Sequence, residues 1–185
     1  MIETVLEDTR QGMNKKIEAL KQELTKLRTG RASLSILDGI KVDYYGTPTP
    51  LNQVASLAVP ESRLITLQPW DNTVIGAIEK AILKSELGLT PMNDGKIIRI
   101  AIPPLTEDRR KDLVKVVRKI VESYKVGIRN TRRESNEQLK DLKKEGDISE
   151  DEMFKAQEKV QKITDDYIET ADKIGSKKEK EVLEF

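Results

Sequence analysis

Apolar residues at helical spacing occupy both ends of this 185-residue chain, and a stretch with strand-like alternation separates them. Over residues 2–29 the apolar positions recur in steps of three and four, which is typical of a helix packed along a seam. They are Ile2, Leu6, Met13, Ile17, Leu20, Leu24 and Leu27. The same spacing returns over residues 106–145 and after Ser149, which can form a capping box with Glu152. Three such stripes must bury against one another, so we predict an elongated three-helix bundle.

Residues between the first two helical stretches follow strand and turn rules instead. Apolar and polar residues alternate over 40–44, and residues 46–50, with two prolines, are expected to end that strand. Asp71 can cap a short helix that ends near Gly88. Further strands are predicted at 54–59, 64–68 and 97–102. The fold class is therefore α+β, a three-helix bundle with a compact β/α module inserted between its first two helices.

The domain boundaries follow from the chain breakers. Residues 1–29 and 105–185 are assigned to the bundle and residues 31–103 to the inserted domain. Gly30 gives rotational freedom at one crossing, whereas consecutive prolines stiffen the other. We interpret the crossings as hinges, with a side contact that fixes the two domains as the alternative. The hinge residues are Arg28, Thr29, Gly30, Arg31, Pro103, Pro104 and Leu105.

A row of basic residues distinguishes the second long helix. Seven Lys or Arg side chains fall within an arc of about 100° on that helix, away from its apolar face. At ~1.5 Å per residue the row is roughly 33 Å long, enough to follow a run of phosphates. A solvated helix face is the alternative, but of the final arginines Arg129 and Arg132 lack an acidic residue four positions away. The row, called the basic stripe below, comprises Lys111, Lys115, Arg118, Lys125, Arg129, Arg132 and Arg133.

Composition argues against catalysis. The chain has no cysteine and no histidine, which excludes disulfides, thiolate chemistry and the usual general base near neutral pH. No paired-carboxylate or Gly-rich phosphate motif is present. The sequence also shows neither an apolar run near 18 residues nor a signal segment. We predict a soluble cytoplasmic binding protein that is not an enzyme and uses no metal or cofactor.

The aromatic residues of the middle region are assigned to packing. Tyr44 and Tyr45 alternate across a predicted strand, so one should face the core and the other solvent or the hinge, with base stacking as the alternative role. Trp70 follows Pro69 and is expected to pack inside the domain.

Several segments, in order, resemble the ribosome recycling factor family over essentially the whole chain. The most specific is Val42–Leu51, which reads VDYYGTPTPL. Two mild departures are Leu34, where many relatives have proline, and Trp70, where a smaller aromatic is common. The other matching segments are Leu27–Ser33, Leu87–Leu89, Pro103–Lys111 and Arg129–Arg133.

The resemblance implies an L-shaped monomer of roughly transfer-RNA dimensions with no membrane association. Its elongated three-helix bundle would form one arm and an inserted β/α/β sandwich domain the other. Family members act after peptide release and, with elongation factor G and GTP, split the ribosome so that messenger RNA and deacylated transfer RNA leave. The GTP chemistry belongs to the partner. The arginine cluster Arg129, Arg132 and Arg133 is implied to grip large-subunit ribosomal RNA. Other candidate RNA-binding residues are Arg28, Arg31 and Arg110, near the domain junction, together with Lys111, Arg118 and Lys125.

Two other classes of protein share some of these features. A helical factor that stabilises ribosomes would have the same basic stripe but no need for a hinge. A coiled-coil chaperone would require exposed apolar tips, and none is evident in the sequence. An enzyme is the least favoured reading.

Overall fold

The computed structural model describes residues 1–184, which divide into two compact units. The bundle unit comprises residues 1–29 and 107–184, and the β/α unit comprises residues 30–106. The β/α unit is therefore inserted between the first and second long helices. Leu105 and Thr106, which the sequence interpretation gave to the bundle, group with the β/α unit.

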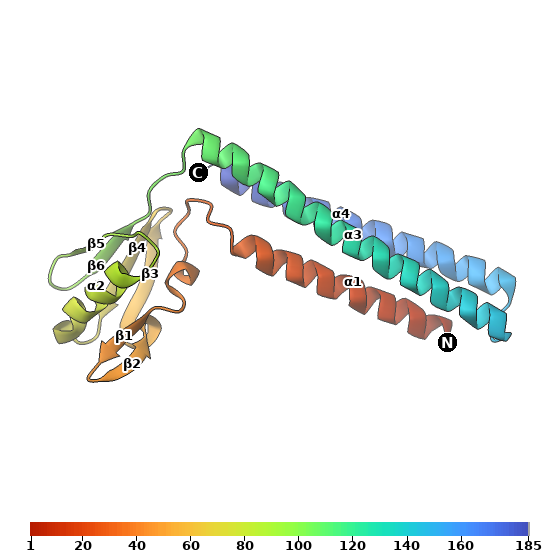
Figure 1. Cartoon of the computed structure of the whole chain (residues 1–185), viewed down its shortest axis with the longest axis horizontal. Coiled ribbons are helices and arrows are strands. Elements are labelled where there is room, and N and C mark those ends of the chain that lie inside the picture. The colour runs from red at the N-terminus through yellow and green to blue at the C-terminus, as the bar shows by residue number, and fades with distance from the viewer. Residues whose placement is uncertain (185) are drawn as a thin grey trace. The chain divides into compact units, whose positions relative to one another are not determined.

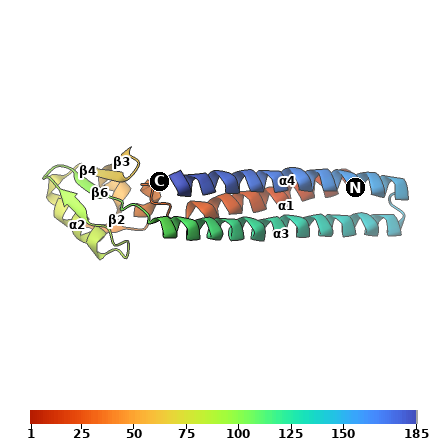
Figure 2. The same ribbon diagram turned by 90° about the horizontal axis from the view of Figure 1, so that it is seen from above.

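Three long helices form the bundle unit: α1 (Ile2–Thr25), α3 (Glu107–Glu145) and α4 (Glu150–Glu184). Helices α1 and α4 run antiparallel to α3, and α1 packs against both of the others (Figures 1 and 2). The predicted seam of α1 is buried from Leu6 to Leu24. That helix ends at Thr25, earlier than the predicted residue 29, although Gly30 does take the expected left-handed conformation, with φ +77°.

The turn between α3 and α4 confirms the predicted capping. Gly146 has φ +85°, and its N–H donates to Lys143 O at 3.2 Å, so it terminates α3. Ser149 N donates to Glu152 Oε2 at 2.8 Å, and Glu152 N donates back to Ser149 Oγ at 3.3 Å. This reciprocal pair satisfies two backbone donors that would otherwise be unpaired at the start of α4.

Glycines and small polar residues let the three helices approach closely. Gly175 of α4 faces Val121 of α3, and Gly12 of α1 faces Thr131 of α3. In the same interface the Thr9 and Ser135 hydroxyl oxygens lie 2.6 Å apart and are buried. Each hydroxyl is thereby satisfied inside an otherwise apolar seam, where an unpaired one would be costly.

A four-stranded antiparallel sheet and one helix make the core of the β/α unit. The strands are β3 (Ala55–Glu61), β4 (Leu64–Pro69), β6 (Ile98–Ala101) and β5 (Pro91–Asn93), in that spatial order. Helix α2 (Ile75–Lys84) follows a 3-10 turn whose cap is Asp71, as predicted. The helix and the sheet share one apolar core, whose fully buried members include Ile65, Leu67, Ile78, Ile82, Ile98 and Ile100.

A two-stranded hairpin corrects one prediction. Residues 46–50 were expected to end a strand, yet β1 (Lys41–Tyr44) pairs with β2 (Thr47–Pro50). Tyr45 (φ +50°) and Gly46 (φ +84°) form the two-residue turn between them. In such a hairpin the pairs Asp43↔Pro48 and Lys41↔Pro50 are the ones that exchange no hydrogen bonds, so neither proline removes a ladder bond.

The aromatic side chains of the β/α unit differ in how far they are exposed to solvent. Tyr44 is half-buried against the core and Tyr45 is 75% exposed, as the alternation predicted. The Tyr45 hydroxyl donates to Asp71 Oδ2 at 2.9 Å. The prediction that Trp70 packs inside was wrong, because its side chain is 68% exposed.

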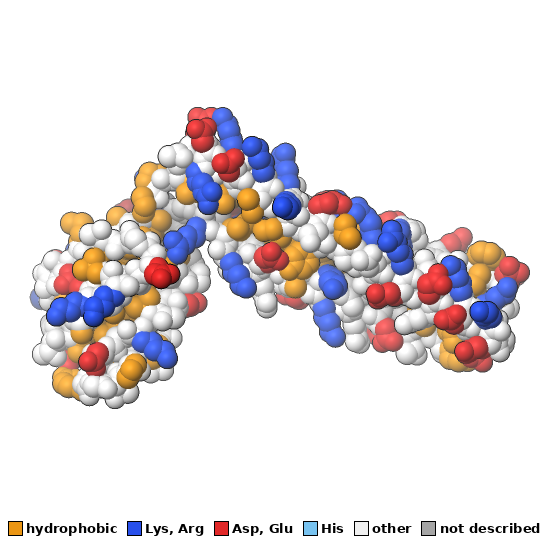
Figure 3. All heavy atoms as spheres, in the orientation of Figure 1, with side chains coloured by type: hydrophobic (Ala, Val, Ile, Leu, Met, Phe, Trp, Pro, Cys, Tyr) orange, Lys and Arg blue, Asp and Glu red, His pale blue; other side chains and the backbone are white. Residues whose placement is uncertain are grey.

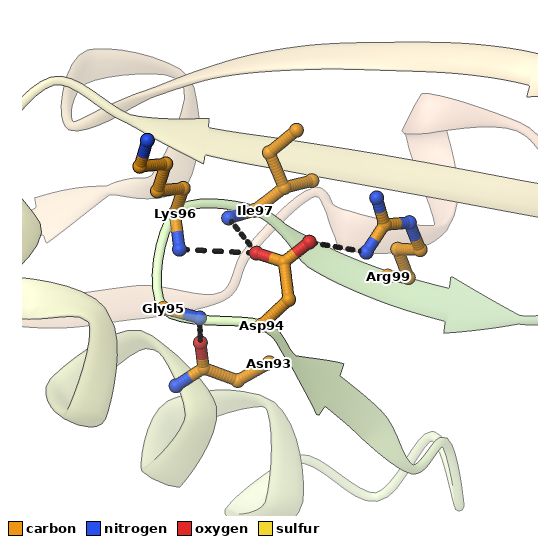
Figure 4. A network of polar contacts seen from close by, with 6 residues as sticks. All are labelled: Asn93, Asp94, Gly95, Lys96, Ile97 and Arg99. Carbon is orange, nitrogen blue, oxygen red and sulfur yellow. Dashed lines mark hydrogen bonds and ion pairs between the residues drawn. The ribbon is translucent and has the colours of Figure 1, made fainter.

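The turn between β5 and β6 is ordered by two side chains (Figure 4). Asp94 accepts hydrogen bonds from the backbone N–H groups of Ile97 at 2.8 Å and Lys96 at 3.0 Å, and it pairs with Arg99. These bonds, with the Ile97 N–H contributing most, lower the pKa of Asp94 to about 2. Asn93 Oδ1 accepts from Gly95 N at 2.6 Å, so side chains of the turn itself bind three of its backbone N–H groups.

Candidate RNA-binding face

The basic stripe lies along α3, on the side of that helix that adjoins α4 in the bundle unit. Figure 3 shows Lys and Arg side chains in a row along this side of the helices, with acidic side chains between them. Lys111 and Lys115 each pair with an acid one turn earlier, Glu107 at 2.8 Å and Asp112 at 3.5 Å. These carboxylates therefore reduce the net positive charge of the face.

The middle of the stripe pairs with acids from α4. Arg118 Nε and Nη2 donate to the two oxygens of Glu179, both at 3.0 Å. This two-pronged bond raises the pKa of Arg118. Lys125 Nζ lies 2.9 Å from Asp172 Oδ1, and only 16% of the lysine side chain is exposed. Lys125 is therefore mostly shielded from solvent, whereas Arg118 stays exposed with its charge balanced by Glu179.

Glu122 of α3 neutralises the next arginine. Its Oε1 accepts from Arg129 Nη1 at 2.8 Å, and its Oε2 lies 3.6 Å from Lys125 Nζ. The hydrogen bond from Arg129 is the main reason that the pKa of Glu122 is lowered. The carboxylate thus stays ionised at neutral pH and keeps its charge next to Arg129.

Arg132 and Arg133 have a different environment. Arg132 Nη1 donates to Gln161 Oε1 at 3.2 Å, and Arg133 Nη1 donates to Asn130 Oδ1 at 3.4 Å. Both acceptors are neutral amide oxygens, and within residues 1–184 no carboxylate forms an ion pair with either guanidinium. Positive charge is therefore concentrated at this end of the stripe.

The remaining candidate residues lie outside the stripe. Arg110 is at the start of α3, where its Nη1 donates to Leu183 O at 3.3 Å. Arg28 is exposed just after α1, and Arg31 is exposed in the β/α unit. The fold thus places six of the nine candidates on one stripe of α3, and the other three elsewhere.

The two chain crossings lie side by side. Gly30 is buried, and a Cβ built on it would lie 3.1 Å from Leu105 Cγ. Thr29 is also buried, whereas Pro103 and Pro104 are exposed. Glycine is therefore favoured at position 30 for two reasons: the backbone is left-handed there, and the Leu105 side chain lies close to it.

A groove of about 690 Å³ in the β/α unit is lined by the β3–β4 turn and the segment after β6, with Glu61 and Arg63 as its charged side chains. The described side chains form no cluster of three or more acids that could hold a metal ion. Within residues 1–184, no helix has the length and apolar content needed to cross a membrane.

Sequence reasoning did not identify the acids of this face. Glu122 stands three residues before Lys125 and seven before Arg129, so its role could have been inferred from helical spacing. Asp172 and Glu179 lie on α4, and nothing in the stripe itself indicates which face of another helix adjoins it. Gln161, the partner of Arg132, was missed for the same reason.

Comparison with known proteins gives a consistent result. Residues 20–183 match the family model described as ribosome recycling factor. The ribosome-recycling factors of Desulfatibacillum aliphaticivorans and Desulfosudis oleivorans are 64% and 61% identical to this chain, each over the full length of both proteins.

Solved structures agree over the same length. A solution structure of the ribosome recycling factor has 42% identity and a TM-score of 0.74, and covers 100% of this chain and 98% of its own. A second structure, 48% identical with a TM-score of 0.63, covers 99% of each chain. It is described as the T. thermophilus ribosome recycling factor and the E. coli elongation factor G bound to the E. coli post-termination complex. On this evidence, the chain belongs to the ribosome recycling factor family.

Proposed function

We propose that this protein binds the post-termination ribosome and, with elongation factor G and GTP, splits it into subunits. Messenger RNA and deacylated transfer RNA then leave, and the subunits are free for another round of initiation. The observation that carries this proposal is family membership over the full length, with 64% identity to a ribosome-recycling factor. The structural relative described with elongation factor G on the post-termination complex supports the same partners.

The bundle unit supplies the RNA-binding face in this proposal. Arg132 and Arg133 are its centre because their hydrogen-bond partners are uncharged. Guanidinium groups bind phosphate through two parallel hydrogen bonds, which suits them to the backbone of structured RNA. Arg129 adjoins this centre. Lys111, Arg118 and Lys125 lie further along α3, where each pairs with a carboxylate, so they add positive charge near the face without a phosphate contact assigned to them. Arg28, Arg31 and Arg110 are assigned to secondary contacts.

The two chain crossings are proposed as the points at which the protein bends. Residues 28–31 and 103–105 join the units, and Gly30, at φ +77°, has no Cβ to restrict its backbone dihedral angles. Bending there would let elongation factor G act on one unit while the other stays bound to RNA. The protein itself is proposed to be a non-enzymatic, cytoplasmic monomer, with GTP hydrolysed by its partner.

Subunit separation is the direct test. Intact bacterial ribosomes carrying messenger RNA and deacylated transfer RNA are incubated with the protein, elongation factor G and GTP, and subunits are followed by light scattering. We expect splitting only when all three are present, and no GTP or ATP turnover by the purified protein alone. A protein that instead slows subunit separation would be a ribosome-stabilising factor, contrary to the proposal.

A further inference from the structure

The basic stripe is compensated along most of its length. Its first five cations meet five carboxylates, so each positive charge has a negative partner. The seven cations and five acids together carry a net charge of +2, which is the charge of Arg132 and Arg133. The five acids are Glu107, Asp112, Glu122, Asp172 and Glu179.

Glu179 provides the strongest of these compensations. It occupies the Nε and Nη2 groups of Arg118 at 3.0 Å, the same pair of donors that a phosphate would use. An RNA phosphate must displace Glu179 to use these two donors, and a phosphate on the other N–H groups of the guanidinium would lie next to the carboxylate. Because like charges repel, Arg118 gains little from contact with RNA while Glu179 is present.

Local packing does not explain the pair. The Arg118 side chain is 69% exposed and that of Glu179 is 23% exposed, and an ion pair with a solvent-exposed partner contributes little to the stability of a fold. The bond joins residues 61 positions apart, on different helices, so helical spacing does not produce it by default. Its clear effect is on charge, since it removes one binding position from the row.

We infer that Glu179, supported by Glu122 and Asp172, is a specificity-determining residue that confines phosphate binding to Arg132 and Arg133. This inference rests on the proposed function. Seven open cations over roughly 33 Å would bind any RNA backbone and slide along it. A basic stripe whose first five cations are neutralised contacts few phosphates. The protein therefore favours one binding position on the ribosome. Low affinity for other RNA also leaves the factor free to dissociate after the subunits separate.

The test compares Glu179→Gln, Arg118→Ala and the double variant of the full-length protein. Binding to large ribosomal subunits and to an unrelated RNA duplex is measured over a salt series. Glu7→Gln is the matched control, because Glu7 also pairs with an arginine, Arg10, but on α1.

We expect Glu179→Gln to bind the unrelated duplex several-fold more tightly, with a salt slope steeper by roughly one. Arg118→Ala alone should change binding to either RNA less than about twofold, yet in the Glu179→Gln protein it should abolish the gain. Thermal unfolding midpoints of all variants should stay near that of the native protein.

Two results would overturn the inference: a Glu179→Gln effect no larger than that of Glu7→Gln, or an Arg118→Ala effect equally large in both backgrounds. Failure of the native protein to bind large subunits would instead refute the proposed function. The two failures are therefore distinguishable within one data set.

Discussion

Gly175 of α4 lies so close to Val121 of α3 that a Cβ built on the glycine would be 2.8 Å from Val121 Cγ2. Real Cβ atoms do not tolerate that distance, and a valine in a helix has little rotamer freedom with which to yield. The close packing of α3 against α4 therefore depends on the absence of a side chain at Gly175. The same interface holds the Arg118–Glu179 and Lys125–Asp172 pairs.

Replacing Gly175 with Ala should destabilise the bundle unit. Overpacking costs ~1–3 kcal/mol, which outweighs the ~0.5–1 kcal/mol that alanine gains over glycine in a helix. Gly127→Ala is the control, because its added Cβ would lie 3.5 Å from the flexible Lys16 side chain. Urea unfolding should show a loss for Gly175→Ala and a gain for Gly127→Ala. Equal gains would mean that Val121 yields freely.

Replacing Arg132 with Ala should weaken binding to the large subunit several-fold or more. A charged hydrogen bond contributes ~1.5–3 kcal/mol, whereas a surface substitution usually changes stability by less than ~0.5 kcal/mol. The logarithm of affinity should fall linearly with the logarithm of salt, with a slope shallower by roughly one than in the native protein. Arg10→Ala on α1 is the control. Native affinity for Arg132→Ala at low salt would remove this residue from the RNA-binding face.

Replacing Gly30 with Ala should slow subunit splitting while large-subunit binding stays within about twofold. Alanine at φ +77° costs ~1–2 kcal/mol, and its Cβ would press on Leu105 in the other crossing. Gly39→Ala has a similar backbone cost, with φ +86°, but its Cβ would meet nothing within 4 Å. Equal splitting rates for the two variants would show that the crossings are connectors and not hinges.

Asp94 should make the β/α unit sensitive to acid. Its pKa is about 2 in the folded protein and its ordinary value is 3.8, so the stability it contributes is fully present above that ordinary value. That stability is lost as pH falls from 3.8 towards 2, because the unfolded chain takes up the proton first. Asp94→Asn should therefore be less stable than the native protein near neutral pH, and the gap should close in acid. The difference in stability between the two proteins is measured from urea unfolding midpoints at several pH values. A difference that does not change with pH would contradict the lowered pKa of Asp94.

Much of the fold could be predicted from periodicity because the bundle buries one continuous stripe per helix. The seam from Leu6 to Leu24 and the Ser149 capping box are local patterns, and both are confirmed. The end of α1 was misplaced because Gly30 was taken as the stop signal, while the helix ends at Thr25. A glycine marks a left-handed residue reliably but does not fix how many residues precede it outside the helix.

The errors in the β/α unit have physical reasons. Prolines usually argue against a strand, but Pro48 and Pro50 occupy the positions of β2 where no N–H is needed. Trp70 was assigned to the interior from its place next to Pro69, and its side chain is 68% exposed. The parity of β4 could have corrected this, because Ile65, Leu67 and Pro69 face inward and the next residue must face outward.

The RNA-binding face was only partly predictable. The basic stripe on α3 could be predicted because it depends only on the spacing of residues along one helix. Its compensation by Asp172 and Glu179 depends on the packing of α4 against α3, which no single-helix pattern contains. A charge count along one helix therefore overestimated the open positive charge.

The insertion of the β/α unit also determines the order in which the protein can assemble during its own synthesis. Helix α1 ends at Thr25 and α3 begins at Glu107, so about eighty residues must be made before α1 meets its first helical partner. At ~5–20 residues per second this takes several seconds, during which the β/α unit can fold alone. The seam of α1 remains unburied throughout that interval, and the first helix to be synthesised is among the last to pack.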